Sequence, residues 1–196
     1  ATTAHTYASS GSFTARVTET SSAGTSTTRV FTGQTMSRNG GPTATTSHEV
    51  VIAALLSFIA PASASFADTL NGLDQTSIAT PAFSLTNSGA SGWNVSATST
   101  QFTTGFRTLG TDAISVPSAP TIICETTCTH ATNQVSYPYN LPAGSTAPTA
   151  TKIFDAAAAT GIGNQTVTPT FRLAIPANTY AGVYTSTWTF TLSSGP

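Results

Sequence analysis

The chain has 196 residues, enough for one β-domain with an appendage or for two small domains with cores of their own. Only 7% of the residues are charged, against about 25% in an average soluble protein, so small hydroxyl-bearing residues form much of the surface. With a net charge of −1 and no basic stripe, the chain is not expected to bind nucleic acid. This composition is typical of secreted β-proteins, and we expect an extracellular, cell-surface location.

The N-terminal block predicts a β-hairpin. Phe13, Ala15 and Val17 alternate with polar residues, residues 21–24 supply a turn, and a second strand is expected over residues 25–32. A two-stranded hairpin is marginal in water by itself and leaves one face without a partner. We therefore expect it to act as an arm that packs against the rest of the chain or against another copy.

Short motifs in this block carry a resemblance. His5-Thr-Tyr7, Gly11-Ser-Phe13, Val17 and Ala23-Gly24 together resemble the end of a PKD-type immunoglobulin-like domain, over residues 1–33. The match covers the last two strands of that family. The resemblance implies either that the upstream strands of such a domain precede this sequence or that the hairpin packs against something else.

Residues 34–65 predict a linker followed by an apolar segment. The linker, from residue 33 to 47, contains Asn39-Gly-Gly-Pro42 and has no apolar periodicity. Residues 50–60 are the most apolar stretch of the chain, but they are too few for a membrane span, which needs about 20. With Ala62-Ser-Ala64 after it, the stretch resembles a signal-peptide core and its cleavage site. As structure, it fits either a buried helix or a continuous strand between two sheets.

Residues 66–196 predict an all-β, immunoglobulin-like β-sandwich of short antiparallel strands, because short apolar runs are separated by Gly, Pro and Asn at regular spacing. The expected strands cover residues 66–70, 82–86, 93–98, 113–116, 121–124, 134–139, 150–154, 167–175 and 183–192.

The last of these strands has the clearest pattern. Tyr184, Trp188, Phe190 and Leu192 share one face and threonines occupy the other, which is the period of a strand with one buried face. The turn after residue 175 leads us to expect that residues 167–175 are its antiparallel neighbour. Within that neighbour, Pro169 lacks an N–H and predicts an edge or a bulge.

Two tryptophan motifs carry a second resemblance. Trp93-Asn-Val95 and Trp188-Thr-Phe190, with the run from residue 175 to Tyr184, resemble the WxL family of bacterial surface domains over residues 66–196. Val95 and Phe190 stand where that family has Leu. The resemblance implies a secreted β-rich protein that associates non-covalently with the cell wall. For the two tryptophans themselves, we expect core packing rather than direct contact with a ligand.

The two cysteines, Cys124 and Cys128, are four residues apart. In an oxidising compartment, they are expected to close a small disulfide ring at a hairpin tip, which stabilises the fold by about 2 kcal/mol through loop entropy. A metal site that recruits His130 and Glu125 is the alternative, but four ligands within seven residues would be cramped.

Other local motifs point to modification rather than catalysis. Asn94 and Asn164 begin sequons that would accept a glycan in a suitable host. The chain has no nucleophile elbow, zinc-protease motif or phosphate-binding loop. We expect no enzyme and no cofactor, and the isolated aspartates are expected in turns or caps: Asp68, Asp74, Asp112 and Asp155.

Two functions fit this sequence. In the first, the protein is a subunit of a surface filament or layer in which the N-terminal arm of one copy completes the sheet of the next. Apolar residues of the arm and the apolar segment would set the register: Phe13, Val17, Val51 and Ile59. In the second, residues 66–196 attach a larger secreted protein to a cell-wall polymer.

Overall fold

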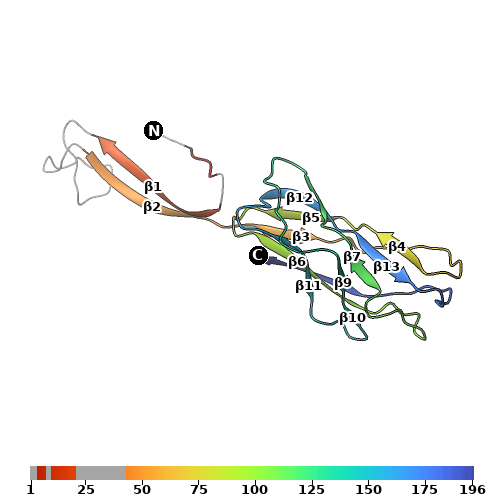
Figure 1. The fold of residues 1–196 in the computed structure, drawn as a ribbon. Helices are drawn as coiled ribbons and strands as arrows, with labels where there is room; N and C mark the ends of the chain where they lie inside the picture. The colour runs from red at the N-terminus through yellow and green to blue at the C-terminus, as the bar shows by residue number, and fades with distance from the viewer. Residues whose placement is uncertain (1–3, 8–9, 21–42) are drawn as a thin grey trace. The chain divides into compact units, whose positions relative to one another are not determined.

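A computed structural model describes residues 4–7, 10–20 and 43–196. The described secondary structure is entirely β, so the structure contains no described helix that is long and apolar enough to cross a membrane. The chain divides into two compact units, Ala1–Ala54 and Leu55–Pro196. The first unit holds a two-stranded hairpin, which we call the arm, and the second is a β-sandwich (Figure 1), as the sequence predicted.

The arm consists of β1 (Gly11–Thr20) and β2 (Thr43–Ile52), which pair antiparallel along their whole length. A hairpin was predicted, but the partner of its first strand was wrong: β1 pairs with residues 43–52, whereas residues 25–32 lie outside the described residues. Residues 43–47 were expected in a linker. They are rich in threonine, whose β-branched side chain suits an extended strand without any apolar alternation.

The apolar segment contains no helix and is not one continuous strand. Its start belongs to β2, and after residues 53–55 the chain continues as β3 (Leu56–Ile59), which pairs with an edge of the sandwich. Leu56 and Phe58 point toward the core while Ser57 and Ile59 are exposed, so β3 has one buried face. Neither the buried helix nor the continuous strand between two sheets is present; the segment is extended in two separate strands, one in the arm and one at an edge of the sandwich.

The other described strands all belong to the sandwich, with the following bounds: β4 (Gln75–Ala79), β5 (Phe83–Asn87), β6 (Trp93–Thr100), β7 (Ile114–Val116), β8 (Thr121–Cys124), β9 (Tyr139–Leu141), β10 (Ala143–Gly144), β11 (Thr151–Ala156), β12 (Gly163–Thr168), β13 (Phe171–Ile175) and β14 (Trp188–Ser194). One layer contains the strand orders β3-β5-β12-β8 and β4-β13-β7-β9. In the other layer β6 lies between β14 and β11, with β10 paired to its end.

A pair of prolines divides the first layer into two ladders. Val167 pairs with Phe83 and Phe171 pairs with Ala79, so the same antiparallel register continues from β5–β12 into β4–β13. That register places Pro81 opposite Pro169. Neither proline has an N–H to donate, so the ladder is interrupted on both strands at the same level. The strand predicted over residues 167–175 is accordingly two strands that meet at the break.

The core lies between the two layers. Its largest fully buried side chains are aromatic or branched and come from both layers: Phe83, Trp93, Phe154, Phe171, Leu85, Ile114, Leu141 and Ile153. All residues of the core cluster fall within Leu55–Pro196. The sandwich therefore has its own hydrophobic core, built without side chains from the arm.

The predicted neighbour of the last strand was wrong. β14 pairs with β6, with Trp188 opposite Ser99 and Leu192 opposite Val95, whereas β13 pairs with β4 and β7. The reason is that β13 and β14 lie in opposite layers and meet across the core, where the rings of Phe171 and Trp188 are 4.9 Å apart. The predicted alternation along β14 is present, because its large side chains are half-buried and its threonines are exposed.

Two predicted strands are mostly loops, and β4 and the short β10 were not predicted. Residues 66–70 and most of 134–139 have no ladder of their own; instead they cover neighbouring strands through side-chain hydrogen bonds. The missed strand β4 buries Ser77 and Ala79 and exposes Ile78, so it shows no apolar alternation in the sequence. Because the buried residues of β4 are small, its sequence has no apolar residue at every second position.

Candidate functional site

The pairing register of β1 and β2 shows which side chains lie on each of the two faces of the arm. Phe13, Ala15 and Val17 share one face with Val50 and Ile52 of β2, and we call these five residues the apolar face of the arm. The register also places two polar residues on it, His48 opposite Ala15 and Thr46 opposite Val17. Val17 is 61% exposed, so a valine on a paired strand remains largely in water. The other four residues of this face are half-buried. Burying Val17 would stabilise the protein by about 1.5–3 kcal/mol.

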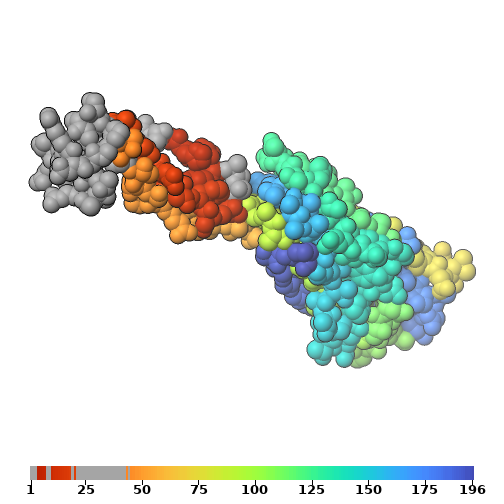
Figure 2. All heavy atoms as spheres, turned by 60° about the vertical axis from the view of Figure 1, so that its left-hand side comes forward, coloured from red at the N-terminus to blue at the C-terminus, as the bar shows by residue number. Residues whose placement is uncertain are grey.

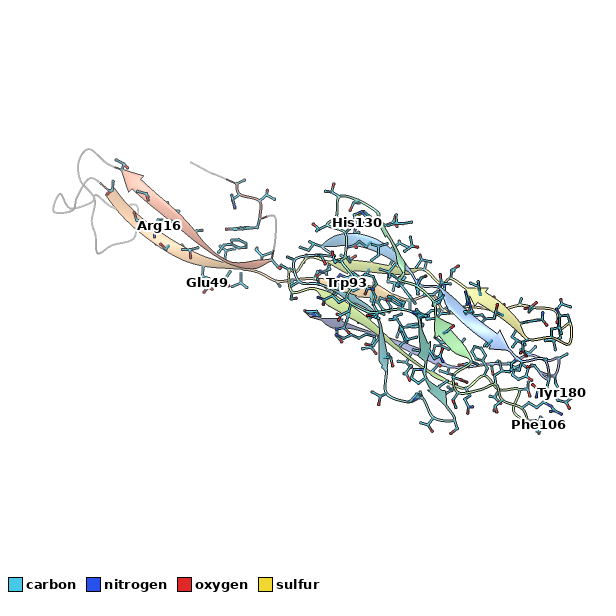
Figure 3. The ribbon with its side chains drawn as sticks, viewed as in Figure 1. Arg16, Glu49, Trp93, Phe106, His130 and Tyr180 are labelled. Carbon is cyan, nitrogen blue, oxygen red and sulfur yellow. A yellow bond between two sulfur atoms is a disulfide. The ribbon has the colours of Figure 1, made fainter. Side chains whose placement is uncertain are left out.

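The opposite face of the arm is mostly polar. It carries Arg16 and Glu49, both of which Figure 3 shows on the hairpin, together with Val51, which is 68% exposed. Of the residues expected to direct assembly, Phe13 and Val17 therefore lie on one face and Val51 on the other. Ile59 lies outside the arm, on β3 of the sandwich, and is 71% exposed.

A short aromatic cluster lies at the start of the arm. The ring of Tyr7 packs on Phe13 at 4.5 Å, and His5 packs edge-on against Tyr7 at 4.7 Å. These contacts cover part of Phe13, which is half-buried, and leave Val17 uncovered. The cluster fixes the chain before β1 but does not complete a core for the arm.

The two tryptophan motifs lie on neighbouring strands, because β6 and β14 pair with each other. Trp93 is fully buried, stacks on Phe154 at 5.0 Å, and donates its indole N–H to the carbonyl oxygen of Gly161 at 2.9 Å. Trp188 is half-buried and contacts Phe171 edge-on. Both side chains pack inside the sandwich.

The structure joins Cys124 and Cys128 in a disulfide, with their Cα atoms 5.7 Å apart. The ring lies directly after β8, whose partner is β12 rather than the next strand in sequence, so it is not at a hairpin tip. Both thiols are in the bond, and Glu125 accepts a hydrogen bond from Thr166 at 2.5 Å. In the part of the chain that the structure describes, no cluster of three metal-binding side chains occurs.

The two sequons differ in access. Asn94 is buried on the central strand β6, and its side-chain amide donates to the carbonyl oxygen of Gly195 at 2.9 Å. Asn164 is exposed on β12. A glycan on Asn94 would have to break that hydrogen bond, so Asn164 is the accessible one of the two.

Two loops at the end of the sandwich expose aromatic side chains, and we call residues 103–108 and 179–185 the tip loops. They are joined by reciprocal backbone hydrogen bonds between Thr103 and Thr185, both 2.9 Å long. Phe106 is fully exposed, and Arg107 lies over the ring of Tyr180, 3.3 Å from its centroid. Figure 3 shows Phe106 and Tyr180 together at this end, and Figure 2 shows it in green and blue.

A polar cluster that the sequence did not reveal lies along the edge of β11. Tyr137 donates its hydroxyl to the carbonyl oxygen of Ile153 at 2.7 Å, and Tyr139 donates to that of Lys152 at 2.8 Å. Asp155 is buried and forms an ion pair with Lys152 at 2.9 Å, so it is not the turn or cap residue that was expected. These contacts hold residues 133–139 against β11.

Burial changes the ionisation of both tyrosines. Loss of solvent raises the pKa of Tyr137 from its usual 10.0 to about 12, against a smaller lowering by Asn133. Loss of solvent also raises the pKa of Tyr139, and the nearby Tyr137 adds to that rise. The folded chain therefore holds these phenolic protons more tightly than the unfolded chain does.

This difference predicts an alkaline loss of stability. Below about pH 10 both states keep the phenolic protons, but between about pH 10 and 12 the unfolded chain releases them first, so the free energy of unfolding falls as pH rises. Urea unfolding at about pH 9 and pH 11 should show a smaller loss in a Tyr137→Phe, Tyr139→Phe double variant than in the parent. The exposed Tyr180→Phe is the control, and an equal loss in all three proteins would contradict the assignment.

No family model, curated protein or solved structure matches this chain. The described structure contains a sandwich with its own core, an arm whose apolar face leaves Val17 exposed, and tip loops that expose aromatic side chains.

Proposed function

We propose that the chain is a non-enzymatic, extracellular structural protein, a subunit of a surface filament or layer. Copies assemble by β-strand complementation, in which the arm of one copy completes a sheet of another. Such an exchange between different surfaces of identical subunits is a heterologous contact, which forms open filaments when it does not close into a ring.

The observation that carries this proposal is the pairing within the arm. β1 and β2 pair over ten residues each, yet the arm includes none of the core of the sandwich and leaves Val17 61% exposed. Two-stranded hairpins are marginally stable in water unless a third strand or another element covers their apolar face. A second copy supplies both the missing strand partner and the missing cover.

Two further features support an extracellular location. The disulfide between Cys124 and Cys128 is a bond that forms and persists in oxidising compartments. The charge-poor surface, with only 7% of residues charged, is typical of β-proteins outside the cell.

Replacing the apolar face tests the proposal. We expect a Phe13→Ser, Val17→Ser double variant to lose assembly, measured by static light scattering across a concentration series, because each lost burial removes about 1.5–3 kcal/mol from the contact. A Thr14→Ser, Thr18→Ser variant changes the opposite face of the same strand and should assemble as the parent does. Equal assembly of both variants would contradict a role for the apolar face.

The tip loops favour a second candidate, attachment of a secreted protein to a cell-wall polymer. Phe106 is fully exposed beside Arg107, and exposed aromatic rings and arginines are common at binding surfaces. In cosedimentation with purified cell-wall sacculi, a Phe106→Ala, Arg107→Ala variant should be retained less than the parent. Retention of the variant at the level of the parent would count against attachment through the tip loops.

A further inference from the structure

Several edges of the sandwich are protected. The edge of β4 is covered by residues 67–71, where the side chain of Gln75 donates to the carbonyl oxygen of Thr69 at 2.9 Å and Ser77 donates to that of Ala67 at 3.1 Å. The edge of β11 is covered by residues 132–139, through backbone bonds such as Gln134 N–H to the carbonyl oxygen of Asp155. Proteins commonly block sheet edges in this way, because an open edge pairs with other chains.

The edge of β14 has no covering loop in the described part of the chain, although β3 of the other layer lies close to it. β14 is seven residues long and pairs along one side with β6, and the described residues provide no backbone partner on its other side. It contains no proline and no charged residue, the two residue classes that most often block an edge. Three other edge strands of the described sandwich are shorter: β3 and β8 have four residues each, and β9 has three.

We propose that β14 is the edge that accepts the arm, and that β1 of a second copy pairs along it. This assignment rests on the proposed function, because it names the surface that the arm completes. The occupant is a second copy of this chain because the chain itself contains a strand pair of sufficient length whose apolar face leaves Val17 exposed.

The side-chain patterns of the two strands match. On β14, Trp188, Phe190 and Leu192 are half-buried and point toward the core, and the threonines between them are exposed. On β1, Phe13, Ala15 and Val17 repeat the same period of two, with Thr14, Arg16 and Thr18 on the other face. Pairing of the two strands would continue the apolar face beside the half-buried rings and keep hydroxyl groups in water.

Cross-linking can identify the edge directly, because both native cysteines are in the disulfide and an introduced cysteine is the sole free thiol of the chain. A full-length Thr14→Cys protein is mixed with full-length Thr191→Cys protein and a short bismaleimide, which tolerates an offset in register. Different tags on the two proteins resolve the mixed dimer by mass. Facing side chains on neighbouring strands are about 5 Å apart, within reach of the reagent.

Two matched partners test two of the other edges: Thr121→Cys on β8 and Ser57→Cys on β3, both exposed like Thr191. We expect roughly tenfold more mixed dimer with Thr191→Cys than with either, because pairing raises the local thiol concentration. If light scattering shows assembly but the cross-link forms equally well or better on β8 or β3, the assignment to β14 is wrong and the proposed function stands. If none of the proteins assembles, both proposals fail.

Discussion

Deletion of residues 1–52 is expected to abolish assembly while leaving the sandwich folded. The deletion removes β1 and β2 but keeps β3 and every residue of the core cluster. Since no core side chain is lost, the free energy of unfolding of the sandwich should change by less than about 0.5 kcal/mol. Light scattering and urea unfolding of the truncated and intact chains measure the two effects separately.

The same pair of measurements distinguishes the alternatives. A truncated chain that unfolds at much lower urea would show that the arm stabilises its own sandwich, and its role in assembly would then be in doubt. A truncated chain that assembles as the intact one does would remove the arm from the contact altogether. The proposed function requires the remaining combination, in which assembly is lost and stability is kept.

Trp93→Ala is expected to destabilise the sandwich by about 3–5 kcal/mol, the usual cost of removing a large buried ring. The ring of Trp93 is fully buried and stacked on Phe154, and its N–H donates to Gly161. The substitution therefore leaves both a cavity and a carbonyl oxygen without this donor. Urea unfolding monitored by circular dichroism measures the effect without relying on tryptophan fluorescence.

Two other variants should destabilise the sandwich less than Trp93→Ala. Trp93→Phe keeps most of the ring volume but loses the hydrogen bond to Gly161, so it should cost less than Trp93→Ala. Trp188→Ala should also cost less, because Trp188 is half-buried on an edge strand. If Trp93→Ala cost no more than Trp188→Ala, the fully buried ring would not be the larger contributor to stability.

The sequence predicted the faces of strands better than their neighbours. The period of two along β14 identified its buried face, because the backbone alone determines which side chains share a face. It carried no information on whether the partner was β6 or β13, since both supply apolar side chains at the same spacing. The ladder between β14 and β6 settles that choice, and Phe171 of β13 packs against Trp188 from the opposite layer.

The elements that the sequence missed have weak local signals. β2 begins in a run of threonine and serine without apolar alternation, and β4 buries Ser77 and Ala79. The tyrosine cluster beside β11 joins residues of a loop to a strand that follows it, and no short motif encodes that contact. Pro169 was expected at an edge or a bulge, but it lies between β12 and β13, each of which has a partner on both sides. Its missing N–H coincides instead with a break in the ladder.

In the proposed function, the sandwich supplies stability and the arm supplies assembly. The sandwich has a core of its own, whereas the arm pairs only with itself among the described residues and exposes Val17 and Val51. A marginal hairpin attached to a stable domain is the arrangement that strand complementation requires, since the arm gains its stabilisation when it binds.

Negative-stain electron microscopy of the intact chain tests the central claim most directly. The account predicts filaments or sheets whose subunit repeat disappears when residues 1–52 are deleted. Dispersed single-copy particles at every concentration, in the intact and the truncated chain alike, would contradict it.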